Sequence, residues 1–146
     1  MLSLSSELPA PDMRLYQGRE EIFDPCRRKW VALTSEEWVR QRLIQQFTIE
    51  LLIPTSLISV EKEIELYGLR KRYDLLVFDR DGMPWLMAEC KSADIPLGTT
   101  VMEQLLRYHI RIPATYLVIS NGMETRCWQK STDGLTACAS WPSLGK

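Results

Sequence analysis

Three residues whose types could do chemistry lie in a strongly apolar stretch, "YDLLVFDRDGMPWLMAECK", which runs from Tyr73 to Lys91. Asp74 precedes the turn signal "DRDG", and Glu89 and Lys91 follow it. Because residues i and i+2 share one face of a strand, Glu89 and Lys91 would lie together. Two acids and an amine in a segment that otherwise looks like protein core need a physical reason.

The turn signal predicts a hairpin that brings the two acids level. Asp74 and Glu89 are equally far from a turn centre between residues 81 and 82. Carboxylates opposite each other destabilise a sheet, and Lys91 offsets only one of the two charges. A hard divalent cation bound by oxygen ligands would satisfy both carboxylates. Such an ion beside a lysine suits hydrolysis of a phosphodiester, because it activates water and neutralises charge on the phosphate.

The flanking segments predict an α/β sandwich around a mixed sheet. A helix is expected over residues 34–52, with Thr34 or Ser35 as its cap and Pro54 after its end. The segments expected to follow are a strand over 56–68, the hairpin, a helix over 97–112 and strands over 114–122 and 124–131. The order is α-β-β-β-α-β-β. Residues 1–28 are rich in proline and predict an irregular N-terminal arm.

Composition sets the class of protein. The 146 residues suffice for one domain, and a formal net charge of −1 argues against bulk attraction to nucleic acid. Local clusters such as "LRKRYD" would have to supply that attraction. The four cysteines show no metal-ligand spacing, and no signal or membrane-spanning segment is evident, so we expect a cytoplasmic protein with free thiols that does not engage a membrane.

The spacing of Asp74 and Glu89-Cys90-Lys91 resembles the signature of the PD-(D/E)XK nuclease superfamily, with Tyr73 where the variable proline stands. More specifically, the chain is similar to the nuclease domain at the N-terminus of type I restriction enzyme R subunits, in a small stand-alone form. The phrases that carry this resemblance are "RKWVALTSEEWVRQ", "LISVEKEI", "RYDLLVFDRDG", "AECKS", "EQLLRY" and "YLVISNG". The resemblance implies a restriction-endonuclease-like core, with residues 29–146 as a single domain.

The resemblance also implies roles and partners. Asp74, Glu89 and the Cys90 carbonyl would bind Mg²⁺ or Mn²⁺, Lys91 would act on the nucleophile, and Glu36 would lie near the ion. The remaining implied contacts are to DNA, from Gln104 and Tyr108 of a Q-x-x-x-Y element, while the basic residues before Asp74 would rim the site: Arg70, Lys71 and Arg72. The chain has no Walker loop and no evident sequence-reading module. A targeting or motor protein would therefore be a partner, and a homodimer would be compatible with double-strand cleavage.

Simpler readings stay open beside these. Glu89 and Lys91 can form a surface ion pair, Glu36 can serve the helix dipole, and Gln104 and Tyr108 can be ordinary helix residues. The main functional hypothesis is a metal-dependent endonuclease-like domain acting on DNA. The alternative is a non-catalytic nucleic-acid-binding or assembly module that keeps the nuclease fold.

Overall fold

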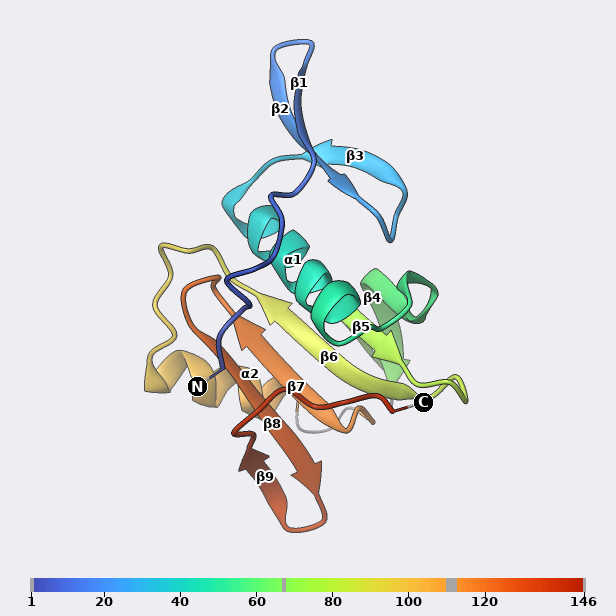
Figure 1. Ribbon diagram of the computed structural model, residues 1–146. Coiled ribbons are helices and arrows are strands. Elements are labelled where there is room, and N and C mark those ends of the chain that lie inside the picture. The colour runs from blue at the N-terminus through green and yellow to red at the C-terminus, as the bar shows by residue number, and fades with distance from the viewer. Residues whose placement is uncertain (1, 67, 110–112, 146) are drawn as a thin grey trace.

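A six-stranded mixed sheet carries both candidate acids (Figure 1). The computed structural model describes residues 2–66, 68–109 and 113–145. The strands follow one another across the sheet in chain order, with β6 and β7 parallel and the other neighbours antiparallel. Their bounds are β4 Ile58–Leu66, β5 Leu69–Phe78, β6 Pro84–Cys90, β7 Tyr116–Ser120, β8 Thr125–Ser131 and β9 Gly134–Ala137.

The first predicted helix is confirmed as α1, Ser35–Gln45, which runs on into a π-helical turn η1, Gln46–Glu50. Thr34 is the cap, since its Oγ1 accepts a hydrogen bond from the Glu37 N–H at 3.0 Å. A short 3₁₀ turn η2, Thr55–Leu57, leads into β4. The second helix is α2, Thr99–His109.

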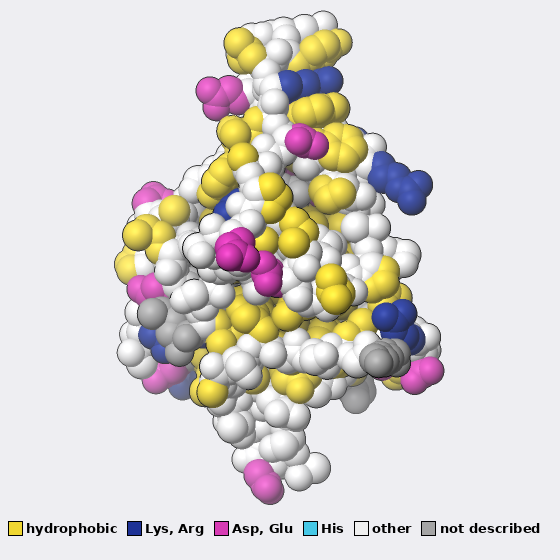
Figure 2. All heavy atoms as spheres, in the orientation of Figure 1, with side chains coloured by type: hydrophobic (Ala, Val, Ile, Leu, Met, Phe, Trp, Pro, Cys, Tyr) yellow, Lys and Arg dark blue, Asp and Glu magenta, His cyan; other side chains and the backbone are white. Residues whose placement is uncertain are grey.

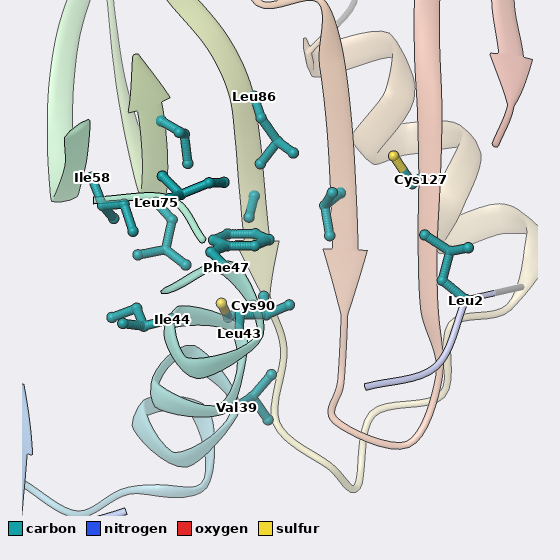
Figure 3. Packing of buried hydrophobic residues seen from close by; sticks show 14 residues of the cluster. Leu2, Val39, Leu43, Ile44, Phe47, Ile58, Leu75, Leu86, Cys90 and Cys127 are labelled. Carbon is teal, nitrogen blue, oxygen red and sulfur yellow. The ribbon is translucent and has the colours of Figure 1, made fainter. Parts of the chain in front are cut away.

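The two helices cover opposite faces of the sheet. Apolar residues of α1 and of the η1 turn that continues it, among them Leu43 and Phe47, pack on Leu75, Ala88 and Cys90 (Figure 3). On the other face Leu106 of α2 packs against a smaller cluster. The apolar members of that cluster are Tyr73, Leu76, Met87, Ala114 and Leu117. The expected mixed sheet flanked by helices is therefore present, and burial of these side chains is the main force that holds the layers together.

The prediction of an irregular arm over residues 1–28 is wrong for residues 13–24. These residues form β1, Met13–Tyr16, and β2, Arg19–Asp24, which pair with β3, Lys29–Ala32, in a separate three-stranded antiparallel sheet. Gln17 and Gly18 both have positive φ, 50° and 76°, the backbone that a tight two-residue hairpin turn requires. The predicted boundary between residues 28 and 29 falls within this sheet, between β2 and β3.

Two hairpins project from opposite ends of the molecule, β1–β2 and β8–β9 (Figure 1). Strand β9 was not predicted from the sequence. Among the described residues, the observed order therefore adds four strands to the predicted ones: β1, β2 and β3 before α1, and β9 after β8. Within the described ranges, no helix is long and apolar enough to cross a membrane.

Candidate active site

The predicted hairpin register is confirmed by the pairing of β5 with β6. Leu75 lies opposite Ala88 and Leu76 opposite Met87. Asp74 and Glu89 occupy the next position beyond the last of these pairs. The Asp74 carboxylate closes the ladder there, because its Oδ2 accepts a hydrogen bond from the Cys90 N–H at 2.6 Å. Lys91 follows directly, with its Nζ 3.6 Å from Glu89 Oε1.

Backbone contacts fix this end of β6 on both sides. The Lys91 N–H donates to the Ser120 carbonyl of β7 at 2.8 Å. The N–H and C=O of one strand residue point to the same side of the strand, so the Cys90 carbonyl faces the β5 side, where Asp74 lies. The Cys90 thiol, by contrast, is buried in the core beneath α1. Only the carbonyl of Cys90 is therefore suited to serve as a ligand.

Both acids are only partly accessible, with about a fifth of each side chain exposed: 18 % for Asp74 and 21 % for Glu89. Burial, reinforced by the nearby Asp74 carboxylate, raises the pKa of Glu89 to about 7. Burial also raises the pKa of Asp74, while the hydrogen bond from Cys90 and the charge of Arg40 limit that rise. The raised pKa values thus reflect the cost of holding two ionised carboxylates close together in a partly buried site.

Glu36 stands at the start of α1 and is exposed. Its charge contributes to the raised pKa of Glu89, so the helix N-terminus lies near the hairpin end. A direct link supports this placement, because Ser35 Oγ accepts a hydrogen bond from the Ala93 N–H at 3.2 Å and lies 2.8 Å from Ser92 Oγ. Glu37, the residue after Glu36, instead forms ion pairs with Arg27 and Arg40.

An ion-pair network lies on the other side of Asp74. Arg40 of α1 is 5 % exposed, and its Nη2 lies 3.4 Å from Asp74 Oδ1. The same guanidinium contacts Glu61 Oε1 at 2.9 Å and Glu37 Oε1 at 3.3 Å through Nη1. Arg27 joins Glu37 Oε1 at 2.7 Å to the fully buried Asp24 at 2.6 Å. This set, which we call the Arg40 network, ties the small sheet and α1 to β4 and β5.

Apart from Asp74, the sequence did not single out the members of the Arg40 network as site residues. The spacing of Glu37 and Arg40 at i and i+3 on a helix was a usable signal for one of its pairs. The contacts of Arg40 with Glu61 and Asp74 span 21 and 34 residues, so no local pattern announces them. They appear only once β4, β5 and α1 are packed.

The other predicted residues lie outside this centre or outside the described part. Arg70 is largely exposed and sits 3.5 Å from Glu63, and Arg72 forms an ion pair with Glu61. Gln104 is exposed on α2. The side chains of Lys71 and Tyr108 are not among those described. Figure 2 shows Lys and Arg side chains spread singly over the face in view, with acidic side chains between them.

The donors fit a hard cation in type but do not form a complete site. Asp74 and Glu89 offer carboxylate oxygens and Cys90 offers a carbonyl, which are the ligands that Mg²⁺ and Mn²⁺ prefer. Over the described residues, no group of three or more His, Cys, Asp or Glu side chains is arranged to hold a metal ion. Any bound ion would therefore keep several waters, as Mg²⁺ commonly does.

Residues 35–139 match the family described as type I restriction enzyme R protein N terminus. The matched segment runs from the start of α1 past the end of β9 and includes both candidate acids and Lys91. No curated protein matches the chain.

Proposed function

Because the chain belongs to the type I restriction enzyme R protein N-terminal family, we propose that it hydrolyses DNA phosphodiester bonds as a PD-(D/E)XK nuclease. The observation that carries the proposal is the hairpin end, where Asp74 and Glu89 occupy facing positions and Lys91 lies beside Glu89. This family link also favours a role in restriction-modification.

Charge balance supports a divalent cation as the cofactor. Among the side chains that the structure describes, those joined to Asp74 and Glu89 by ion pairs or by their charge include six acids and four cations, an excess of two negative charges when all are ionised. The acids are Asp24, Glu36, Glu37, Glu61, Asp74 and Glu89, and the cations are Arg27, Arg40, Arg72 and Lys91. Mg²⁺ or Mn²⁺, held by Asp74, Glu89 and the Cys90 carbonyl, would supply an activated water and stabilise charge on the phosphate.

The chain's own groups divide the remaining work. The Lys91 ammonium can donate hydrogen bonds to the attacking water and to a phosphate oxygen, which orients the two for in-line attack. Glu36 can hold a water at the rim of the site. Arg70, Lys71 and Arg72 on β5, with Gln104 and Tyr108 on α2, would contact the DNA backbone.

A DNA cleavage assay tests the proposal. The purified protein is incubated with supercoiled plasmid and with single-stranded DNA, in Mg²⁺ or Mn²⁺ and in EDTA. We expect cleavage that requires the cation and falls at least about 100-fold in Lys91→Ala, because a positioned charge at the reacting phosphate is lost. Lys130→Ala in β8 is the matched control and should cleave like the natural protein.

A second function has one observation in its favour. The Asp74 carboxylate already accepts from the Cys90 N–H and contacts Arg40, so it is bonded without a cation. A non-catalytic DNA-binding or assembly module would show DNA binding with no cleavage in either cation, and its binding would be unaffected by Lys91→Ala. A targeting or motor protein as partner, and a homodimer for cutting both strands, belong to the nuclease proposal.

A further inference from the structure

Arg40 is the most deeply placed cation beside the candidate site. Its side chain is 6 % exposed, against 18 % for the Asp74 carboxylate that it contacts. The two terminal nitrogens divide the guanidinium between partners. Nη2 reaches Asp74, and Nη1 reaches Glu61 and Glu37. Buried charges persist in proteins when they are paired in this way, and an arginine presents its donors in a rigid fork.

Glu61 reaches Arg40 through an unusual backbone. Its φ is +53°, the left-handed region that a residue with a Cβ adopts at a cost of about 1 kcal/mol. The neighbouring residues pair regularly, Val60 with Leu75 and Lys62 with Tyr73, so the irregularity is confined to the position opposite Asp74. In a regular ladder two acids would face each other there. In the structure the backbone departs from the regular strand at Glu61, and the Glu61 carboxylate accepts hydrogen bonds from Arg40 and from Arg72.

Asp74 is consequently held from two directions. One oxygen is fixed by the Cys90 N–H of β6 and the other by the guanidinium from α1. A carboxylate bonded at both oxygens has a defined orientation before any ligand arrives. The guanidinium also places a positive charge close to where a divalent cation would bind.

We propose that Arg40 acts as the counter-ion of the Asp74 carboxylate in the absence of a divalent cation and competes with that cation for the carboxylate, with Glu61 holding Arg40 in place. This inference rests on the proposed function, because it concerns the same cation site. Arg40 does not touch the reacting atoms in this proposal. It acts through Asp74.

The proposal predicts opposite effects for two substitutions. Arg40→Met removes a positive charge that repels the incoming ion, so Mn²⁺ should bind roughly tenfold more tightly. Glu61→Gln removes a negative charge nearby, so Mn²⁺ should bind roughly threefold more weakly. Damage to the fold alone would weaken binding in both variants. Opposite signs therefore separate an electrostatic role from loss of structure.

The measurement is calorimetric titration of the apo protein with Mn²⁺, accompanied by thermal unfolding in EDTA. Arg40→Met should lower the unfolding temperature in EDTA. Adding Mn²⁺ should raise the unfolding temperature of this variant by more than it raises that of the natural protein. Arg42→Met is the control, since Arg42 lies on the same helix and donates to the Pro9 carbonyl, away from the site. Its Mn²⁺ affinity should stay within about twofold. Arg40→Lys, which keeps the charge, should return Mn²⁺ affinity toward that of the natural protein.

Each outcome decides the question. If Arg40→Met leaves the Mn²⁺ affinity unchanged, or both variants shift it in the same direction, the counter-ion role is overturned while the nuclease proposal stands. If the natural protein binds no Mn²⁺, the cation site and this inference fall together. Should Arg40→Met not fold, Glu61→Gln decides alone. The Glu61 side chain is 34 % exposed, so we expect this variant to fold. An unchanged Mn²⁺ affinity in Glu61→Gln contradicts the proposal.

Discussion

Asp74 and Glu89 lie on neighbouring strands at facing positions, yet their surroundings differ. Asp74 accepts a backbone hydrogen bond at 2.6 Å and belongs to the Arg40 network, in which Arg40 and Arg27 alternate with four acids. Glu89 Oε1 lies 3.6 Å from Lys91 Nζ, and the negative charges of Asp74 and Glu36 help to raise the pKa of Glu89. Asp74 is therefore held by hydrogen bonds and ion pairs from the rest of the fold, whereas Glu89 has a raised pKa to which two neighbouring carboxylates contribute.

The contrast follows from where each strand end lies. β5 runs between β4 and β6 beneath α1, so residues of three elements can reach Asp74. β6 ends at Cys90, and the chain then turns away toward Ser92 and the N-terminus of α1. Glu89 is partly buried there, with 21 % of its side chain exposed, and the nearby Asp74 carboxylate adds to the rise in its pKa. The two acids therefore differ in environment, and the pKa of Glu89 is the more strongly raised of the two.

The largest effect is expected where the Arg40 network is anchored. Asp24 has no exposed surface, and its carboxylate accepts from the Cys26 and Arg27 N–H groups and from Arg27 Nε. Asp24→Asn removes the charge that Arg27 faces, which should cost about 2 to 4 kcal/mol in the free energy of unfolding. Urea unfolding monitored by tryptophan fluorescence measures this cost.

The same variant tests how far the contrast extends. Asp24 is linked to Asp74 indirectly, through Arg27, then Glu37 or Glu61, and then Arg40, so we expect Mn²⁺ affinity to change by no more than about twofold. Asp12→Asn is the control, since its side chain is exposed and should leave stability within about 0.5 kcal/mol. A large change in Mn²⁺ affinity in Asp24→Asn would mean that the network behaves as one unit with the site.

A smaller effect of opposite sign is expected at Glu89. Because its pKa rises from 4.5 to about 7 on folding, the folded state is favoured below pH 4.5 and loses that advantage as the pH rises to about 7. Glu89→Gln removes a carboxylate that is unfavourable when ionised. In EDTA at pH 8 the variant should be more stable than the natural protein by about 1 to 3 kcal/mol.

The pH dependence distinguishes this explanation from a general packing change. At pH 5 Glu89 is mostly protonated in the folded protein, so the gain in Glu89→Gln should shrink toward zero. Glu124→Gln serves as the control, because Glu124 is 39 % exposed with a loose partner at 3.8 Å. A Glu89→Gln variant that is less stable than the natural protein at pH 8 would show that the Lys91 ion pair outweighs the repulsion.

Local patterns predicted the half of the site that depends on local structure. The "DRDG" turn set the register that places Asp74 level with Glu89, and helical spacing with a Thr34 cap set α1. These features depend on residues close in the sequence, so turn chemistry and periodicity suffice.

The Arg40 network could not be predicted in this way. Its contacts join β2, α1, β4 and β5, and their formation depends on how α1 packs on the sheet. The small sheet was missed because Gln17-Gly18 is an uncommon turn pair whose positive φ values are visible only in the structure. Glu61 reads as an ordinary alternating strand residue, and its left-handed backbone has no sequence signal.

The smallest effect is expected at Arg70, because Arg70 and Arg72 show the same difference between an exposed residue and one bonded to the Arg40 network. Arg70 and Arg72 lie two residues apart on β5, but Arg72 bonds Glu61 of the Arg40 network, whereas Arg70 is 75 % exposed and 3.5 Å from an exposed Glu63. Arg70→Ala should change stability by less than about 0.5 kcal/mol, since exposed ion pairs contribute little. If Arg70 contacts the DNA backbone, its loss should weaken binding about threefold for all sequences and reduce the salt dependence by about one released counterion. Fluorescence anisotropy across a salt series measures both quantities, with Arg19→Ala on the distant β1–β2 hairpin as the control. Equal losses in the two variants would show that net charge, rather than the rim of the hairpin end, governs attraction to DNA.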